Sequence, residues 1–177
     1  ERDSCTSTYA SLFDLVLVDF GGHKAKCILL DKAKARSSAR ARASIVGADY
    51  VTIRDLDLAT LPAGDVDRGL LVMNSSATDG AQNNTFDGLS VRLSRTNPGS
   101  IGVQQLAVTT PTSAAGANSN NRYFNLDVAN VAAGVYFKGG LAVPDLGTQL
   151  GTRYGGVTTI GGASPGDIAN GTDLTWG

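Results

Sequence analysis

The stretch NNTFDGLSV at residues 83–91 decides the fold, because nearly the same phrase returns as NNRYFNLDV at residues 120–128. A third version, YVTIRDLDL, lies at residues 50–58. In each one, an apolar residue is followed by two spacers, a leucine, one spacer, and a valine or leucine. The matched sets are Ile53, Leu56 and Leu58; Phe86, Leu89 and Val91; and Tyr123, Leu126 and Val128. The copies are 33 and 37 residues apart, and such a period indicates stacked repeats, each too small to bury its apolar face alone.

Each copy predicts a strand, a one-residue corner and a second strand. Residues that alternate with a period of two lie on one face of a strand, so Leu56 and Leu58 share a face. The two spacers before the leucine break this alternation, and the residue just before the leucine is Asp55, Gly88 or Asn125. These residue types best tolerate left-handed backbone angles. We therefore expect positive φ angles at all three corners.

A second apolar run follows each copy, and the three runs are GLLVM at 69–73, SIGVQQL at 100–106 and AGVYFKG at 133–139. Polar loops rich in small residues then return the chain to the next copy. Helical repeats need an apolar period of 3.6 residues, which this region lacks. The pattern therefore predicts an all-β chain folded as a parallel β-solenoid, in which Leu56, Leu89 and Leu126 stack as a buried column. A β-sandwich is the alternative, but it does not predict that one class of corner residue recurs.

The composition restricts the class of protein. A chain of 177 residues with 42% hydrophobic residues can form one domain with a substantial core. The net charge is −1 and only 18% of the residues are charged, so no global field recruits nucleic acid or an anionic membrane. No apolar run approaches the roughly 20 residues that a membrane span requires. No signal segment opens the chain, and we expect any export signal to lie outside this sequence.

The chain changes character near residue 43. Residues 1–42 carry a net charge of +3 and four of the five lysines, whereas residues 43–177 carry −4 and all ten asparagines. The first part is therefore an atypical basic N-terminal segment, and the second part contains the parallel β-helix coils. Within the segment, residues 11–20 predict a strand, and residues 23–43, rich in Ala, Lys and Arg, favour a helix. We interpret the segment as a cap of the solenoid, with a nucleic-acid or lipid-binding arm and a foreign segment as alternatives.

Four phrases resemble coils of a known family: VGADYVTIRDLDL, NSSATDGAQNNTFDGLSV, TSAAGANSNNRYFNLDV and TTIGGASPGDIANGT. They are similar to right-handed parallel β-helix regions of the pectate-lyase-like superfamily, found in large secreted surface proteins of Bacteroidota associated with type IX secretion. The resemblance covers about residues 44–175 and leaves out residues 1–42. It implies a right-handed parallel β-helix in a protein that is secreted or carried on the cell surface.

The resemblance implies repeats and export, but it implies no single activity, because a fold does not fix a function. We expect a non-catalytic structural or adhesive segment whose partners are surface glycans or other cell-surface proteins. The alternative is a carbohydrate-active β-helix enzyme, a polysaccharide lyase or glycoside hydrolase, or a fragment of one. The last coil, around residues 157–168, has no recognisable polar cap, and this predicts end-to-end self-association.

Asp57 and Asp127 are the candidate catalytic residues of the enzyme alternative. They occupy equivalent positions in their coils, with Ser90 between them. Because stacked coils lie about 4.8 Å apart, carboxylates two coils apart would be roughly 10 Å from each other. This separation is at the upper edge of the range for an inverting pair of glycosidase carboxylates. The structural interpretation is that solvent-facing like charges discourage edge-to-edge aggregation.

Calcium is the one cofactor that the sequence suggests. The stretch SPGDIANGTD offers Asp167, Asn170 and Asp173 as oxygen ligands. Turn chemistry accounts for the same residues, and their spacing matches neither the EF-hand loop nor the glycine-rich nonapeptide repeat. Cys5 and Cys27 are too few for a disulfide framework or a zinc site. Aromatic side chains able to stack on sugars are scarce, and the candidates are Tyr136, Tyr154 and Trp176.

Overall fold

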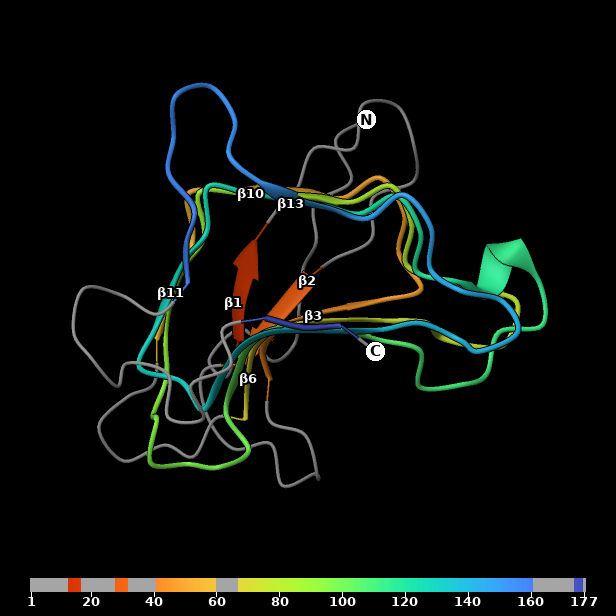
Figure 1. Ribbon diagram of the computed structural model, residues 1–177, viewed down its shortest axis with the longest axis horizontal. Helices are drawn as coiled ribbons and strands as arrows, with labels where there is room; N and C mark the ends of the chain where they lie inside the picture. The colour runs from red at the N-terminus through yellow and green to blue at the C-terminus, as the bar shows by residue number, and fades with distance from the viewer. Residues whose placement is uncertain (1–12, 17–27, 32–40, 60–66, 161–173, 177) are drawn as a thin grey trace.

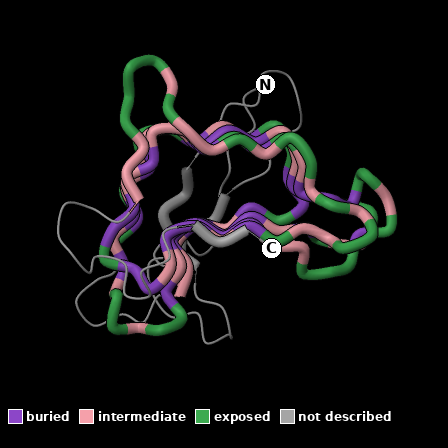
Figure 2. Tube along the Cα trace, in the orientation of Figure 1, coloured by how far each residue is buried: buried purple, intermediate pink, exposed green. Residues whose placement is uncertain are grey.

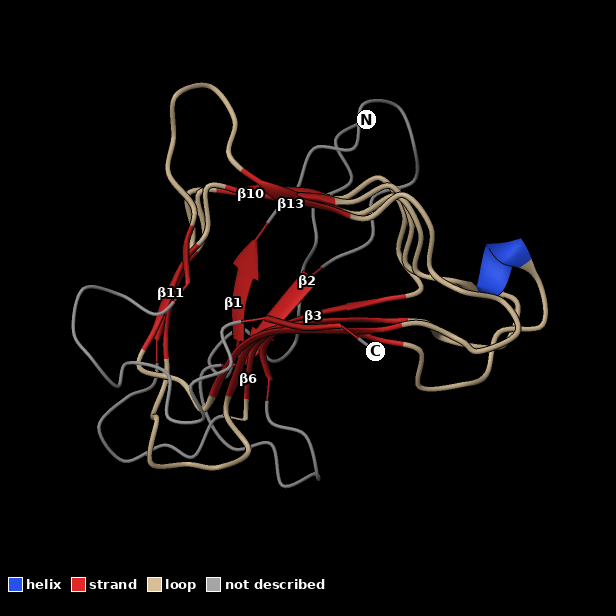
Figure 3. Cartoon of the chain, viewed as in Figure 1, coloured by secondary structure: helices blue, strands red, loops and turns tan. Residues whose placement is uncertain are grey.

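The computed structural model of the chain describes residues 13–16, 28–31, 41–59, 67–160 and 174–176 (Figure 1). Within these ranges the protein is all-β, and its helix content is a single 3-10 turn, η1 (Ala114–Gly116). Three parallel sheets are stacked as a β-solenoid of about three turns (Figure 3). The predicted solenoid is thus confirmed. The β-sandwich alternative is wrong, because neighbouring strands in all three stacked sheets run parallel.

Each full turn of the solenoid contributes one strand to each sheet. The first sheet contains β4 (Thr52–Arg54), β7 (Thr85–Asp87), β10 (Arg122–Phe124) and β13 (Gln149–Gly151). The second sheet contains β5 (Asp57–Ala59), β8 (Ser90–Arg92), β11 (Asp127–Ala129) and β14 (Thr159–Ile160). The third sheet contains β3 (Ala41–Val46), β6 (Arg68–Met73), β9 (Ile101–Leu106), β12 (Ala133–Lys138) and β15 (Leu174–Trp176). Neighbours in a sheet come from successive turns, so one step across a sheet is one turn of the solenoid.

The repeated phrase corresponds to the first two strands of a turn. Ile53 pairs in register with Phe86, and Phe86 pairs with Tyr123, so the periods of 33 and 37 residues are single turns. The next step, from Tyr123 to Leu150, takes only 27 residues. The strands keep their register while the loops between them change length.

The predicted corners lie between the first and second sheets. The φ angles of Asp55, Gly88 and Asn125 are 51°, 72° and 53°, which confirms the left-handed conformation at all three positions. Hydrogen bonds continue across the corner from turn to turn: the amide of Asp55 donates to the carbonyl of Asp87, and that of Gly88 donates to the carbonyl of Phe124, both at 3.0 Å. The corner is therefore part of the stack rather than an interruption of it.

A second column of left-handed residues, which was not predicted, lies just before the first sheet. Its members are Tyr50, Asn83, Asn120 and Gly147, with φ angles of 58°, 57°, 60° and 67°. The doubled asparagine in the repeated phrase follows from this corner. The first asparagine takes the left-handed conformation, and the second, Asn84 or Asn121, is fully buried.

The two buried asparagines form a ladder between turns. Oδ1 of Asn84 accepts a hydrogen bond from the amide of Val51 at 2.8 Å, and Nδ2 donates to the carbonyl of Ala48 at 2.9 Å. One turn later, Oδ1 of Asn121 accepts from the amide of Asn84 at 2.9 Å, and Nδ2 donates to the carbonyl of Ala81 at 2.8 Å. Each asparagine thereby satisfies backbone groups of the preceding turn that the sheets leave unpaired.

Buried residues recur at matching places in successive turns (Figure 2), and most of them are apolar. Leu89 and Leu126 are buried, and Leu56, in the first turn, is partly buried against the same cluster. This confirms the predicted leucine column. The rings of Phe86 and Tyr123 stack with their centroids 5.0 Å apart, so the position before the corner adds an aromatic column to the leucine column.

The N-terminal segment differs from its prediction in part. Residues 11–20 were expected to form a strand, and β1 (Phe13–Val16) confirms this where the structure describes them, pairing antiparallel with β2 (Ile28–Asp31). The helix expected over residues 23–43 is wrong where the structure describes it, because β2 and the start of β3 are strands. Strand pairing overrides the helix propensity of Ala and Arg here: β2 pairs with β1, and β3 with β6.

β2 contacts β3 of the solenoid, and Figure 1 shows the β1–β2 pair within the outline of the coils. β3 itself begins two residues before the change of composition at residue 43 and joins the third sheet. No helix in the described part of the chain is long and apolar enough to cross a lipid bilayer.

Candidate functional site

The second sheet carries the predicted carboxylate column on its outer face. Asp57 pairs in register with Ser90, and Ser90 pairs with Asp127, which pairs in turn with Thr159. Asp57 is exposed, whereas the apolar residue after each column member points inward and is buried, as Leu58 and Val91 are. The structure therefore brings the two predicted carboxylates into one column, two turns apart, with Ser90 between them.

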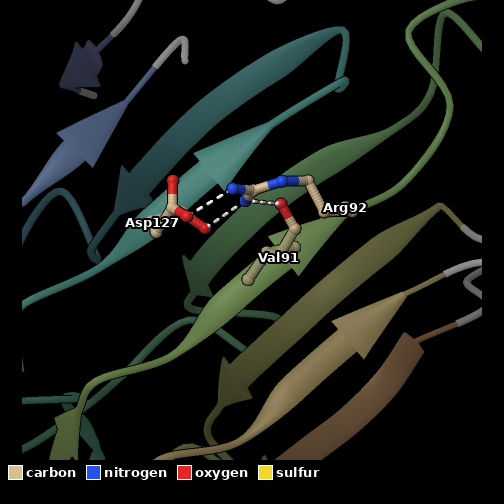
Figure 4. A network of polar contacts seen from close by, with 3 residues as sticks. All are labelled: Val91, Arg92 and Asp127. Atoms are coloured by element: carbon tan, nitrogen blue, oxygen red, sulfur yellow. Dashed lines mark hydrogen bonds and ion pairs between the residues drawn. The ribbon is translucent and has the colours of Figure 1, made fainter. Parts of the chain in front are cut away.

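Asp127 is bound by a residue that the sequence analysis did not single out. Nη2 of Arg92 forms an ion pair with Oδ2 of Asp127, and Nη1 donates to the backbone carbonyl of Asp127 at 2.7 Å and to that of Val91 at 3.0 Å (Figure 4). Arg92 stands two residues after Ser90, so the alternation that turns Ser90 outward also turns Arg92 outward. An exposed ion pair of this kind contributes at most about 1 kcal/mol, but it links β8 to β11.

The outer side of the first sheet carries an arginine–aromatic cluster formed by Phe124, Arg153 and Tyr154. The guanidinium carbon of Arg153 lies 5.5 Å from the ring centroid of Phe124 and 4.2 Å from that of Tyr154. Nη2 of Arg153 also donates to the hydroxyl of Tyr154 at 2.6 Å. Tyr154 remains 84% exposed. Both rings lie within the range of a cation–π interaction.

Polar side chains connect this cluster to the corner beside it. The amide of Arg153 donates to Oδ1 of Asn125 at 3.0 Å, and Nδ2 of Asn125 donates to Oδ1 of Asp87 at 2.6 Å. Asp87 and Phe124 are register neighbours on the first sheet. The carboxylate of Asp87 and the side-chain amide of Asn125 therefore lie on the side of Phe124, and the guanidinium of Arg153 reaches from there to the exposed ring of Tyr154.

A pocket of about 340 Å³ lies beyond the end of β12. Gln105, Asp145 and Thr148 supply its polar groups, and Nε2 of Gln105 donates to Oδ2 of Asp145 at 2.8 Å. Oε1 of Gln105 accepts from the buried hydroxyl of Tyr123 at 2.9 Å. Burial raises the pKa of Tyr123 well above its ordinary value, and the charge of Asp145 adds to the shift. Tyr123 therefore stays a hydrogen-bond donor, and these polar groups hold the interior together.

The remaining predicted site residues have different outcomes. Asp167, Asn170 and Asp173, the candidate calcium ligands, lie outside the described residues, as do Cys5 and Cys27. In the ranges that the structure does describe, no group of three or more His, Cys, Asp or Glu residues is placed to hold a metal ion.

The three candidate sugar-stacking aromatics lie apart in the fold. Tyr136 is half-buried in β12, in register with Gln104. Trp176 belongs to β15, in register with Phe137. Tyr154 alone among them belongs to the arginine–aromatic cluster.

No family model, curated protein sequence or solved structure matches this chain. The solenoid is therefore established by its own strand pairing, and the resemblance to surface proteins of Bacteroidota stays a prediction.

Proposed function

We propose that this solenoid is a non-catalytic structural and adhesive segment of an exported surface protein. The observation that carries the proposal is the ion pair between Arg92 and Asp127. A catalytic pair at this column would need the carboxylates of both Asp57 and Asp127. Instead, Arg92 of the preceding turn binds the side chain and the backbone carbonyl of Asp127. The outward carboxylate of Asp127 therefore contributes to the contact between successive turns.

Other polar side chains support the same use. Nδ2 of Asn130 donates to the carbonyl of Leu93 in the preceding turn at 2.6 Å. Nδ2 of Asn74 donates to the carbonyl of Thr109 in the following turn at 2.6 Å, and its Oδ1 accepts from the amide of Val108 at 2.9 Å. Side chains that join successive turns make a stiff stack with long faces, which suits contact with large partners.

Export and surface display are supported by the resemblance of residues 44–175 to secreted coils. The partners in this proposal are surface glycans or other cell-surface proteins, together with end-to-end association between copies. β13 and β14 favour that association, because within the described residues each pairs with a neighbour on one side only.

A carbohydrate-active enzyme is the second candidate, and the shared outward column of Asp57 and Asp127 favours it. The experiment is a screen of acidic and neutral polysaccharides for unsaturated products and for new reducing ends. We expect no turnover by the chain. Turnover that is lost in Asp57→Asn and Asp127→Asn but kept in Asp79→Asn, a control carboxylate on a loop, would establish the enzyme instead.

A further inference from the structure

We infer that the arginine–aromatic cluster is a binding platform for neutral polysaccharide chains, with Tyr154 as the stacking surface. The inference rests on the proposed adhesive function and deepens it by naming the surface and the chemical class of the ligand. Four features of the described residues carry it: the backbone at Tyr154, the support from Arg153, a gap at Gly151 and the polar groups around them.

The backbone holds Tyr154 in a conformation that tyrosine disfavours. The amide of Gly156 donates to the carbonyl of Arg153 at 3.1 Å and closes a turn whose central residues, Tyr154 and Gly155, have φ angles of 54° and 74°. Two positive φ angles define a type I′ turn, for which Asn-Gly is the preferred pair. A bulky residue at the first of these positions is strained. Because Tyr154 is 84% exposed, packing in the core does not compensate for the strain, and this points to a role for the exposed ring when taken together with its support from Arg153.

Arg153 fixes the ring before any ligand arrives. Its guanidinium lies near the rings of Phe124 and Tyr154 and bonds the Tyr154 hydroxyl, while its amide is anchored on Asn125. A side chain that is already held in one orientation loses little conformational entropy on binding. Tyrosine is therefore presented as a rigid surface rather than as a free side chain.

A gap in the outer face lies beside this surface. The outward row of the first sheet runs Arg54, Asp87, Phe124 and Gly151. A Cβ placed on Gly151 would meet no atom of the described residues within 4 Å. Among the described residues, the row therefore ends without a side chain next to an outward phenylalanine, and this leaves room for a ring-shaped ligand.

The chemistry of the borders fits a neutral sugar. A pyranose ring has an apolar C–H face that packs on an aromatic ring, and hydroxyl groups that both donate and accept hydrogen bonds. The carboxylate of Asp87, the amide of Asn125 and the guanidinium of Arg153 supply acceptors and donors around the rings. The charges of Asp87 and Arg153 offset each other beside the rings, and this local balance favours a neutral ligand over a polyanion.

The experiment uses the full chain and three soluble neutral polysaccharides, a β-glucan, a xyloglucan and a galactomannan, with affinity electrophoresis followed by calorimetric titration. Tyr154→Asn keeps the turn and removes the ring. We expect its Tm to rise, because asparagine suits a positive φ angle, while affinity falls at least about tenfold. Gly151→Gln fills the gap and should weaken binding without lowering the Tm.

Tyr50→Asn is the matched control. Tyr50 is also an exposed tyrosine with a positive φ of 58°, but it belongs to the other corner, three turns earlier. We expect this variant to bind as the unaltered chain does. Binding that survives Tyr154→Asn, an equal loss in Tyr50→Asn, or no binding to any of the three polysaccharides would each overturn the site. Turnover of a bound polysaccharide would leave the site standing and overturn the non-catalytic function instead.

Discussion

Polar side chains inside the coils and polar side chains on their outer faces both form columns, but they are held in different ways. Asn84 and Asn121 are fully buried, and every polar atom of their amides has a backbone partner in the preceding turn. The side chains of Asp57 and Asp127 face the solvent, and Arg92 forms an ion pair with Asp127. The inner columns are therefore fixed by the cost of breaking their hydrogen bonds, whereas the outer ones can change with little loss of stability.

The largest loss of stability is expected when a carboxylate is introduced on the inner face of the coil instead of the outer face. Leu89→Asp should unfold the chain, at a cost of about 4 kcal/mol or more, because it places an unpaired carboxylate in a fully buried position. Ser90→Asp, one residue further along and facing out, should cost only about 1 kcal/mol from repulsion by Asp57 and Asp127. Urea denaturation of both variants measures the contrast, and a folded Leu89→Asp would show that the leucine column is misplaced.

The second effect compares the buried ladder with the exposed column. Asn121→Ala should destabilise the chain by about 3 kcal/mol, because it leaves the amide of Asn84 and the carbonyl of Ala81 buried without partners. Asp127→Ala should cost less than about 1 kcal/mol, since it removes an exposed ion pair. Thermal unfolding of the two variants tests this, and equal losses would contradict the distinction between inside and outside.

The smallest effect compares two glycines at the end of the first sheet: Gly88 at the corner after β7, and Gly151 in β13. Gly88→Val should destabilise the chain by about 2 kcal/mol, because φ at Gly88 is 72° and the new Cβ would lie 2.6 Å from Oδ1 of Asp55. At Gly151 the φ angle is ordinary and the space is open, so Gly151→Val should be neutral or slightly stabilising. A harmless Gly88→Val in the same denaturation assay would place the corner elsewhere.

The features that could be predicted from the sequence are those in which the same class of residue recurs in every turn. The leucines at 56, 89 and 126 and the corner residues at 55, 88 and 125 keep their chemistry from turn to turn, so spacing alone located them. The second corner has no such signal, because a tyrosine at position 50 heads a column of asparagine and glycine. The buried asparagines at 84 and 121 correspond to a valine in the first turn and a threonine in the last. Because the residue class changes from turn to turn, the sequence did not predict the asparagine ladder.

The spacing of residues in the sequence could not predict contacts between side chains of loops and sheet faces. The carboxylate column was predicted because Asp57 and Asp127 occupy equivalent strand positions, but the ion pair depends on the side-chain conformation of Arg92. The arginine–aromatic cluster depends on a tight turn at residues 153–156, whose two consecutive positive φ angles are not repeated elsewhere among the described residues. The helix prediction for residues 23–43 failed for a related reason, since the partner strand that overrode local propensity lies elsewhere in the sequence.

The parallel register of the three sheets also determines how this molecule responds to a pulling force. The hydrogen bonds between turns point along the stack, from one turn to the next. Tension applied along that direction therefore loads the bonds of one turn at a time instead of all of them together. Each turn that opens releases between 27 and 37 residues, or roughly 90–130 Å of extended chain. A tether built in this way lengthens in steps and dissipates mechanical work with each one, while the turns still closed keep their shape.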